Sequence, residues 1–404
     1  MAGHHTARLL TYQGIPVWRH IVVIQWALQV LSAVAVAGLV FWFFTNISNA
    51  IDDRDIPYGF SFLERAYQTP IGEHVLPYDS SDTYAYAFLV AASNTVVLAI
   101  VGVILAISFG TLIGIARISS NWALSRLALA YVEFFRNVPV LVLILFTFYI
   151  MLLLPPVAES YSVGGRVYLH NGGLAVPWPT PAGQALPALA WLALAAAGAA
   201  AGVLTHRFLT RREAVTGHVS YPLTAGIATA LGIALIFWIV IALLSGAAPL
   251  TIETPAPTGR FSTIEGGLHV RAGAIVMLIS LVIYTAAFIA EIVRAGIQSV
   301  GKGQTEAALA TGLHSVGVLR YIVFPQAVRV IVPPLISQCL NLTKNSSLAA
   351  AIGFADLTNV AITMTQTAPA ISIFLIIMAA YLLMSLAWSA IGNIYNWRAR
   401  IVGT

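Results

Sequence analysis

Charged residues are scarce in this 404-residue sequence. Asp, Glu, Lys and Arg make up only 9% of it, against about 25% in a typical soluble domain. Because a soluble protein of this size needs far more charge to cover its surface, the shortage excludes a cytosolic enzyme and a disordered chain. It also excludes a nucleic-acid-binding domain, so the net charge of +5 needs another explanation. The length suits one large membrane bundle.

Groups that carry chemistry are scarce as well. The single cysteine, Cys339, lies in an apolar stretch, so no disulfide framework is available and we interpret it as a small packing residue. The nine histidines lie mainly in loops and lack the spacing of metal ligands. No G-x-x-x-x-G-K-[ST] motif is present to bind the phosphates of ATP. The sequence therefore predicts no catalytic residue, no metal site and no cofactor.

Apolar residues, in contrast, make up 59% of the chain, and the mean hydropathy is +0.87. A membrane-spanning helix needs about 20 mostly apolar residues. We predict eight spans, at 21–44, 86–115, 138–154, 185–204, 223–244, 272–290, 331–352 and 371–391. The third is the shortest, and we expect it to begin earlier, near Leu127. The expected fold class is all-α, a polytopic membrane helix bundle.

The basic residues orient these spans. If the N-terminus is cytoplasmic, most of the 20 Lys and Arg residues fall in segments on the cytoplasmic side. The long segment 46–83, which is then external, is acidic. This is the positive-inside pattern of membrane proteins. It predicts that both termini are cytoplasmic, and it explains the net charge as a topology signal.

The chain divides into four segments. Residues 1–83 hold one helix and the acidic external loop, and residues 84–154 hold the first part of a helical core. Residues 155–267 hold an external stretch rich in Pro and Gly and an inserted hairpin rich in Ala and Gly, which we expect to be peripheral. Residues 268–404 hold the rest of the core and a polar cytoplasmic loop, 303–325.

That polar loop contains the most informative pattern. Ala307 and Ala308 favour a short helix after Gly303 and Glu306. Gly312 is typical of a helix end, and Pro325 of the start of the next element. A short helix below the bundle could dock into a groove of a soluble partner and transmit a rigid-body motion. An ordinary connecting loop is the alternative.

The pattern Glu306-Ala-Ala-x-x-x-Gly312, followed nine residues later by Ile322-x-Phe-Pro325, resembles the EAA loop of ABC-importer membrane subunits. Phe324 stands where that family usually has Leu. The sequences at 93–95, 135–139, 287–297, 325–329 and 344–348 are similar to polar amino-acid permeases of the histidine/glutamine type. The first helix, the long loop and the hairpin resemble the larger Q-type subunit of general L-amino-acid ABC permeases.

The resemblance implies an amino-acid permease subunit of the bacterial inner membrane, with five helices in a type I importer core. It implies that a separate ATP-binding subunit dimer hydrolyses ATP and docks on Gly303, Glu306, Ala307, Ala308, Gly312 and Pro325. It further implies a periplasmic or surface-tethered amino-acid-binding protein. A second, related permease subunit is expected to complete a heterodimer, with a homodimer as the alternative. Membrane lipid surrounds the assembly, and no nucleic acid is bound.

Polar residues within predicted spans are candidates for the substrate path. They are Asn94, Thr95, Asn341, Lys344, Ser346 and Ser347. A structural Lys344, snorkelling or paired with Asp356, is the alternative for that residue. For Asn94 and Thr95 the alternative is interhelical hydrogen bonding.

Glu291 and Arg294 are three residues apart and therefore neighbours on one helix face, and Glu133 and Arg136 repeat that spacing. We expect membrane-edge salt bridges there. An ion-coupled secondary transporter is the second candidate function. Such proteins need acids within spans and often show inverted repeats, and this chain offers almost none of the former and no visible repeat.

Overall fold

A computed structural model describes residues 11–12, 15–16, 20–183, 185–258 and 263–399. The fold is mostly helical, as the sequence predicts. Of the basic residues used to orient the spans, Arg8, Arg19, Arg260 and Arg400 lie outside the described residues.

In the described part of the chain, seven helical segments are long and apolar enough to cross a membrane. They are α1 (Ile21–Asp53), α2 (Tyr84–Arg117), α5 (Ala185–Thr216), α6 (Pro222–Ser245), α7 (Ala272–Gln298), the segment Ser315–Ile352 that contains α10 (Phe324–Asn345), and α12 (Ala370–Ala399). Each coincides with a predicted span.

The remaining predicted span, 138–154, coincides with a helix, but the expectation that this helix begins near Leu127 is wrong. The structure has α3 (Trp122–Asn137) and α4 (Val140–Leu152), bent by 104° at the break between them. Pro139 causes the break, because the residue before a proline is driven to extended backbone, and Val138 has φ −89° and ψ 131°. With 13 residues, α4 is about 20 Å long and cannot cross the bilayer core alone.

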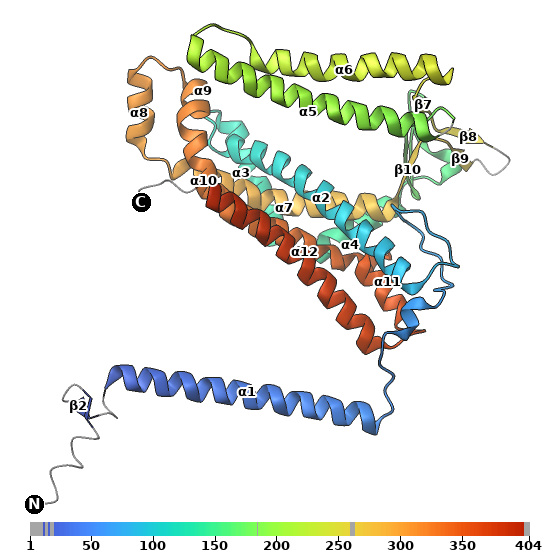
Figure 1. Ribbon diagram of the computed structural model, residues 1–404, viewed down its shortest axis with the longest axis vertical. Helices are drawn as coiled ribbons and strands as arrows, with labels where there is room; N and C mark the ends of the chain where they lie inside the picture. The colour runs from blue at the N-terminus through green and yellow to red at the C-terminus, as the bar shows by residue number, and fades with distance from the viewer. Residues whose placement is uncertain (1–10, 13–14, 17–19, 184, 259–262, 400–404) are drawn as a thin grey trace, which may run out of the picture.

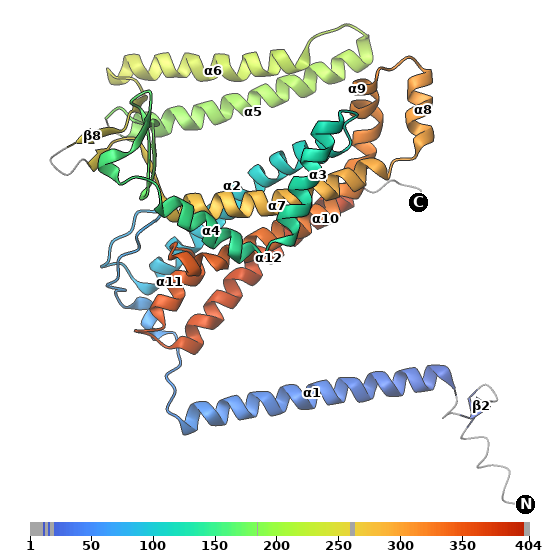
Figure 2. The same cartoon turned by 180° about the vertical axis from the view of Figure 1, so that it is seen from behind.

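Helix α7 forms the centre of the bundle. It packs against α2, α3, α4 and α10 (Figure 1). Its side chains Met277, Leu281 and Ile289 are almost completely buried. Seen from behind, α3 and α4 cross the opposite side of α7 (Figure 2).

Small residues let α2 approach α7 closely. A Cβ atom added to Gly110 would lie 2.7 Å from the Ile289 Cβ and 2.8 Å from the Ala286 carbonyl oxygen. One added to Gly114 would lie 2.7 Å from the Ala290 carbonyl oxygen. Lipid tails are as apolar as the helices, so tight contact of this kind drives helix association in membranes.

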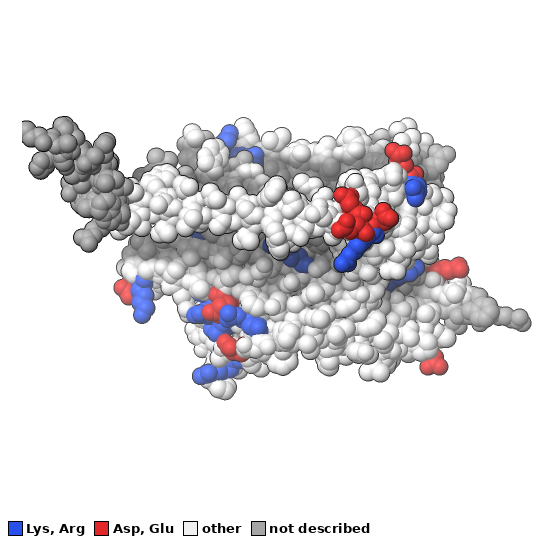
Figure 3. All heavy atoms as spheres, turned by 90° about the horizontal axis from the view of Figure 1, so that it is seen from below, with Lys and Arg blue, Asp and Glu red and all other residues white. Residues whose placement is uncertain are grey.

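Two elements lie beside this bundle. Helices α5 and α6 pack along each other and form a separate layer next to α2 (Figures 1 and 2). Helix α1 has no buried residue. Seen from below, α1 is uncharged along its length, and charged atoms gather at its far end (Figure 3), where Asp52, Asp53, Arg54 and Asp55 follow one another.

Short strands fold the Pro- and Gly-rich stretches, which the sequence analysis treated only as connections. A four-stranded antiparallel sheet joins β3 (Tyr161–Val163), β4 (Val167–His170), β5 (Gly173–Val176) and β10 (Leu268–Arg271). Three two-stranded ladders pair β6 (Trp178–Pro181) with β7 (Leu250–Glu253), β8 (Ala256–Thr258) with β9 (Thr263–Glu265), and β1 (Thr11–Tyr12) with β2 (Ile15–Pro16). Because β5 pairs with β10, the sheet joins the two ends of the inserted hairpin.

The segment before α2 covers the end of the bundle opposite α8 (Lys302–Ala310). It contains a 3₁₀ turn, Ser61–Glu64. Phe62, Tyr67 and Ile71 are buried in a second hydrophobic core. The bundle contributes to that core from α2, α11 (Leu357–Met364) and α12. We call residues 54–83 the cap loop.

Substituting Gly110→Ala tests the close contact of α2 with α7. The new methyl group must displace backbone and Ile289, and overpacking of this kind costs about 1–3 kcal/mol. We expect a lower melting temperature for the detergent-purified protein. Gly38→Ala in α1 is the matched control, because no atom lies within 4 Å of the position its Cβ would take. Equal melting temperatures for the two variants would contradict the contact.

Candidate functional site

The predicted coupling loop forms two short helices at one end of the bundle. Helix α8 spans Lys302–Ala310 and α9 spans Ser315–Val318. Gly312 between them has φ +85°, a conformation that favours glycine, and its N–H donates to the Leu309 carbonyl at 2.9 Å. The prediction that a short helix ends at Gly312 is confirmed.

Helix α8 is attached by one face and exposed on the rest. Ala308 is buried in the core with Val318 and Val323. The other residues named for the coupling loop, Gly303, Glu306, Ala307, Gly312 and Pro325, are exposed. Leu309 beside them is 47% exposed, so the free surface combines a carboxylate with an apolar side chain.

Pro325 lies in the first turn of α10, but it does not begin a separate element. The helical segment runs on from Ser315 through a π-helical turn, Leu319–Val323. A proline ring crowds the carbonyl four residues earlier, here that of Tyr321, and the wider turn relieves that clash. The sequence analysis missed this turn, which makes α9 and α10 mechanically continuous.

An ionic cluster joins α2 and α7 near the coupling loop. Glu291 pairs with Arg294, whose Nε lies 3.1 Å from Oε2, as the spacing predicts. Arg117 at the end of α2 also pairs with Glu291, a contact that no local pattern signalled. Arg136 stacks over the Phe288 ring at 5.4 Å. Among the described residues, no ion pair joins it to Glu133.

Lys344 is exposed on α10 and does not pair with Asp356. Asp356 Oδ1 instead accepts the Asn359 N–H at 2.8 Å, and Oδ2 accepts the Tyr381 hydroxyl at 3.2 Å. The pairing with Asp356, which was one alternative to a path role for Lys344, is therefore wrong. Asn341 lies three residues before Lys344 and is exposed on the same face of α10.

Ser346 and Ser347 sit at the end of α10 but bond within the chain. Ser346 is fully buried, and its hydroxyl donates to the Thr343 carbonyl at 2.8 Å. The Ser347 hydroxyl donates to the Lys344 carbonyl at 2.8 Å. Both hydroxyl groups therefore bond to backbone carbonyls of the turn that contains Lys344.

Asn94 and Thr95 are buried and hold three segments together. The Asn94 amide donates to the Glu73 and Ala355 carbonyls and accepts the Val75 N–H, at 2.7, 2.8 and 3.0 Å. The Thr95 hydroxyl accepts the Leu357 N–H at 2.9 Å. Hydrogen bonding between segments was the alternative to a substrate-path role for Asn94 and Thr95, and the structure shows these bonds. The polar groups of both side chains are engaged in them.

Comparison with known proteins identifies the family. The family described as binding-protein-dependent transport system inner membrane component matches residues 102–401. The chain belongs to this family. It is a multi-pass inner-membrane permease subunit, it carries no cofactor, and it is not an enzyme. Systems of this kind also contain an ATPase and a binding protein. The second candidate, an ion-coupled secondary transporter, is wrong.

Relatives match over nearly the whole permease. The general L-amino acid transport system permease protein AapQ of Rhizobium johnstonii is 40% identical over 93% of this chain and 92% of its own. The putative amino-acid ABC transporter permease protein YhdX of Escherichia coli is 38% identical over 93% of this chain and 94% of its own. A crystal structure of an amino acid ABC transporter with histidines is 21% identical, covers 78% of this chain and 95% of that chain, and superposes with a TM-score of 0.44.

The cap loop of the permease contains one half-buried acid, Glu73. Burial raises the pKa of Glu73 to about 7, although the nearby Arg271 acts to lower it. Its Oε2 atom has no hydrogen-bond partner among the described residues. Among those residues, no group of three His, Cys, Asp or Glu could hold a metal ion.

Asn94→Ala tests the attachment of the cap loop to the permease. The substitution removes the partner of the Val75 N–H and of two carbonyls, and an unsatisfied buried group costs about 1–3 kcal/mol. We expect faster hydrogen exchange in residues 60–83 and unchanged exchange in α7. Ser93→Ala is the control, because the Ser93 hydroxyl bonds only within its own helix, to Val90. Equal exchange in the two variants would refute the attachment.

Proposed function

We propose that this permease carries amino acids. The similarity to AapQ and YhdX supports this, because both names give amino acids as the cargo and both proteins match over more than nine-tenths of this chain. The cargo is a zwitterion, so its path through the membrane needs groups for a carboxylate and an ammonium.

Helix α8 is the proposed docking site for the ATPase subunit. Its support is the exposed surface of Glu306, Ala307 and Leu309 at one end of the bundle. A push on α8 would reach α10 through Ala308, which is packed against Val318 and Val323. Since α9, the π-helical turn and α10 form one helical segment, the same push would move Lys344.

In this proposal, the α8 end faces the cytoplasm and both termini lie there. The cap loop then faces outward, where the binding protein delivers its cargo. Net charge supports this orientation, because the cap loop is acidic while Lys302, Arg320 and Arg329 surround the coupling loop.

A second permease subunit is needed to enclose the path. Lys344 and Asn341 point away from the core of this chain, since both are exposed. A cation facing lipid within a span is costly, so another protein surface or water must cover this face. We propose a related but different permease subunit, which makes a heterodimer, with a second copy of this chain as the alternative.

Glu306→Lys tests the docking assignment. Reconstituted with its ATPase and binding protein, the wild-type permease is expected to take up amino acids when ATP is added, with or without an ionophore. The variant should insert into the membrane normally, but its charge reversal should uncouple ATP hydrolysis from uptake. Gln304→Lys places a lysine two residues away, on another face of α8, and should retain uptake. Unchanged uptake in Glu306→Lys would refute the assignment.

Lys344→Gln tests the path assignment in the same vesicles. A charge-assisted hydrogen bond contributes about 1.5–3 kcal/mol, so losing it should raise the apparent KM for the amino acid roughly ten- to a hundredfold. Arg54→Gln, at the exposed end of α1, removes a cation far from the path and should leave KM unchanged. A wild-type KM in Lys344→Gln would assign Lys344 a structural role.

A further inference from the structure

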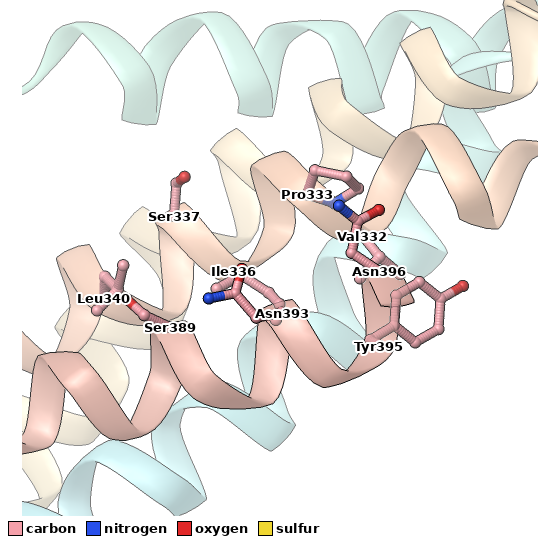
Figure 4. A pocket seen from close by; sticks show the side chains of 10 residues that line it. Val332, Pro333, Ile336, Ser337, Leu340, Ser389, Asn393, Tyr395 and Asn396 are labelled. Carbon is pink, nitrogen blue, oxygen red and sulfur yellow. The ribbon is translucent and has the colours of Figure 1, made fainter. Parts of the chain in front are cut away.

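A groove lies between α10 and α12 (Figure 4). It occupies the half of these two helices that is nearer α8 (Figure 1). Its volume is about 260 Å³. The α10 wall contributes Ser337 and Pro333, and the α12 wall contributes Ser389, Asn393 and Asn396. A hydroxyl group from α10 and hydroxyl and amide groups from α12 therefore line one groove within the spans.

These polar residues belong to two rows that follow helical spacing. On α10, Ser337, Asn341 and Lys344 are four and three residues apart, and all are exposed. On α12, Ser385, Ser389, Asn393 and Asn396 are four, four and three apart. Spacings of three and four place residues on one helix face, so each row runs along its helix. We call these seven residues the polar track.

Two contacts fix the antiparallel register of α10 and α12. The Trp388 indole N–H donates to the Thr343 hydroxyl at 3.0 Å, which places Ser385 and Ser389 at the level of Lys344. Nearer α8, a Cβ added to Gly392 would lie 2.6 Å from the Ile336 Cδ1. The two rows therefore lie side by side from Lys344 down to Asn396.

The same face of α12 is apolar in its other half. Met378 and Leu382 lie seven residues before Ser385 and Ser389, two helical turns away on that face, and both are exposed. A surface that met only lipid would stay apolar along its whole length, because amides in hydrocarbon without partners are costly. The change to polar side chains at the level of Lys344 indicates that water reaches this half of the groove.

The backbone of α10 adds acceptors to the same region. Pro333 and Pro334 have no N–H, so the carbonyls of Arg329 and Val330 lack their usual helical donors. Pro333 itself lines the groove. Carbonyl oxygens freed in this way are tolerated within spans where they face water or a polar ligand.

We propose that the polar track is the route by which the amino acid leaves the level of Lys344 for the cytoplasm. This rests on the proposed function, in which the permease carries amino acids past Lys344. Amides and hydroxyls can both donate and accept, so they bind the carboxylate and the ammonium of a zwitterion. Since the track below Lys344 has no charged side chain, binding along it is weak enough for the cargo to move on.

Cysteine labelling of the assembled transporter tests the route. Cys339 is the only cysteine of this chain, so Cys339→Ser gives a permease subunit without thiols, in which labelling of the introduced cysteine is read. Asn393→Cys is compared with Ile394→Cys, the adjacent exposed position on a different face of α12. We expect a charged, water-soluble methanethiosulfonate reagent to modify Asn393→Cys at least tenfold faster than Ile394→Cys. A saturating amino acid should slow that reaction.

Other results overturn the route. Equal slow rates at both positions, or modification of Asn393→Cys only by a lipid-soluble maleimide, would place the track against lipid. A disulfide between Asn393→Cys and the second permease subunit, with no labelling in the assembled complex, would make the groove a subunit interface. If Cys339→Ser fails to assemble, the natural chain serves as background, because Cys339 is buried.

Labelling by the charged reagent does not require a transported cargo, so two failures can be told apart. Fast labelling in a permease that takes up no amino acid would refute the proposal that amino acids are the cargo, and it would still support a water-filled route along the polar track. Slow labelling in a permease that does take up amino acids would refute the polar track as the route, and the proposal that amino acids are the cargo would stand.

Discussion

The close packing of α2 on α7 is the contact on which the rest of this permease depends. Gly110 and Gly114 allow two backbones to approach where any larger side chain would separate them. Once α7 is centred in this way, α3, α4 and α10 pack around it. Because α2 and α7 approach closely, Arg117 of α2 can reach Glu291 of α7, and this ion pair joins the two helices near α8.

A mechanical connection runs from α8 to the middle of the membrane. Ala308 ties α8 to the end of α9, and the helix continues without a break to Lys344. The π-helical turn and the paired prolines are the two irregular points along it. Helices bend at such points, so a displacement of α8 can change the tilt of α10 while the core around α7 stays packed.

The two ends of the permease differ in how far their polar groups are bonded within the chain. Asn94 fixes the cap loop to α2, Thr95 joins α2 to the start of α11, and the cap loop shares a hydrophobic core with these helices. The α8 end exposes polar and charged groups in a groove and on a short helix. The cap loop therefore covers one end of the bundle with residues of this chain. The exposed polar groups of the α8 end are left for other subunits to cover.

The sequence by itself determined the membrane spans and helix α8. Apolar runs of about 20 residues and the Gly312 stop act locally, so seven spans and α8 could be predicted from neighbouring residues. The tertiary structure decided which polar groups are satisfied internally. Asn94 and Thr95 bond to residues about 260 positions away, and Arg117 pairs with a residue 174 positions away. Asn393 and Ser337 line one groove only because α10 and α12 run antiparallel. Hydropathy depends on the residues nearby in the chain, whereas the partner of a buried polar atom depends on packing between helices that the chain order does not specify.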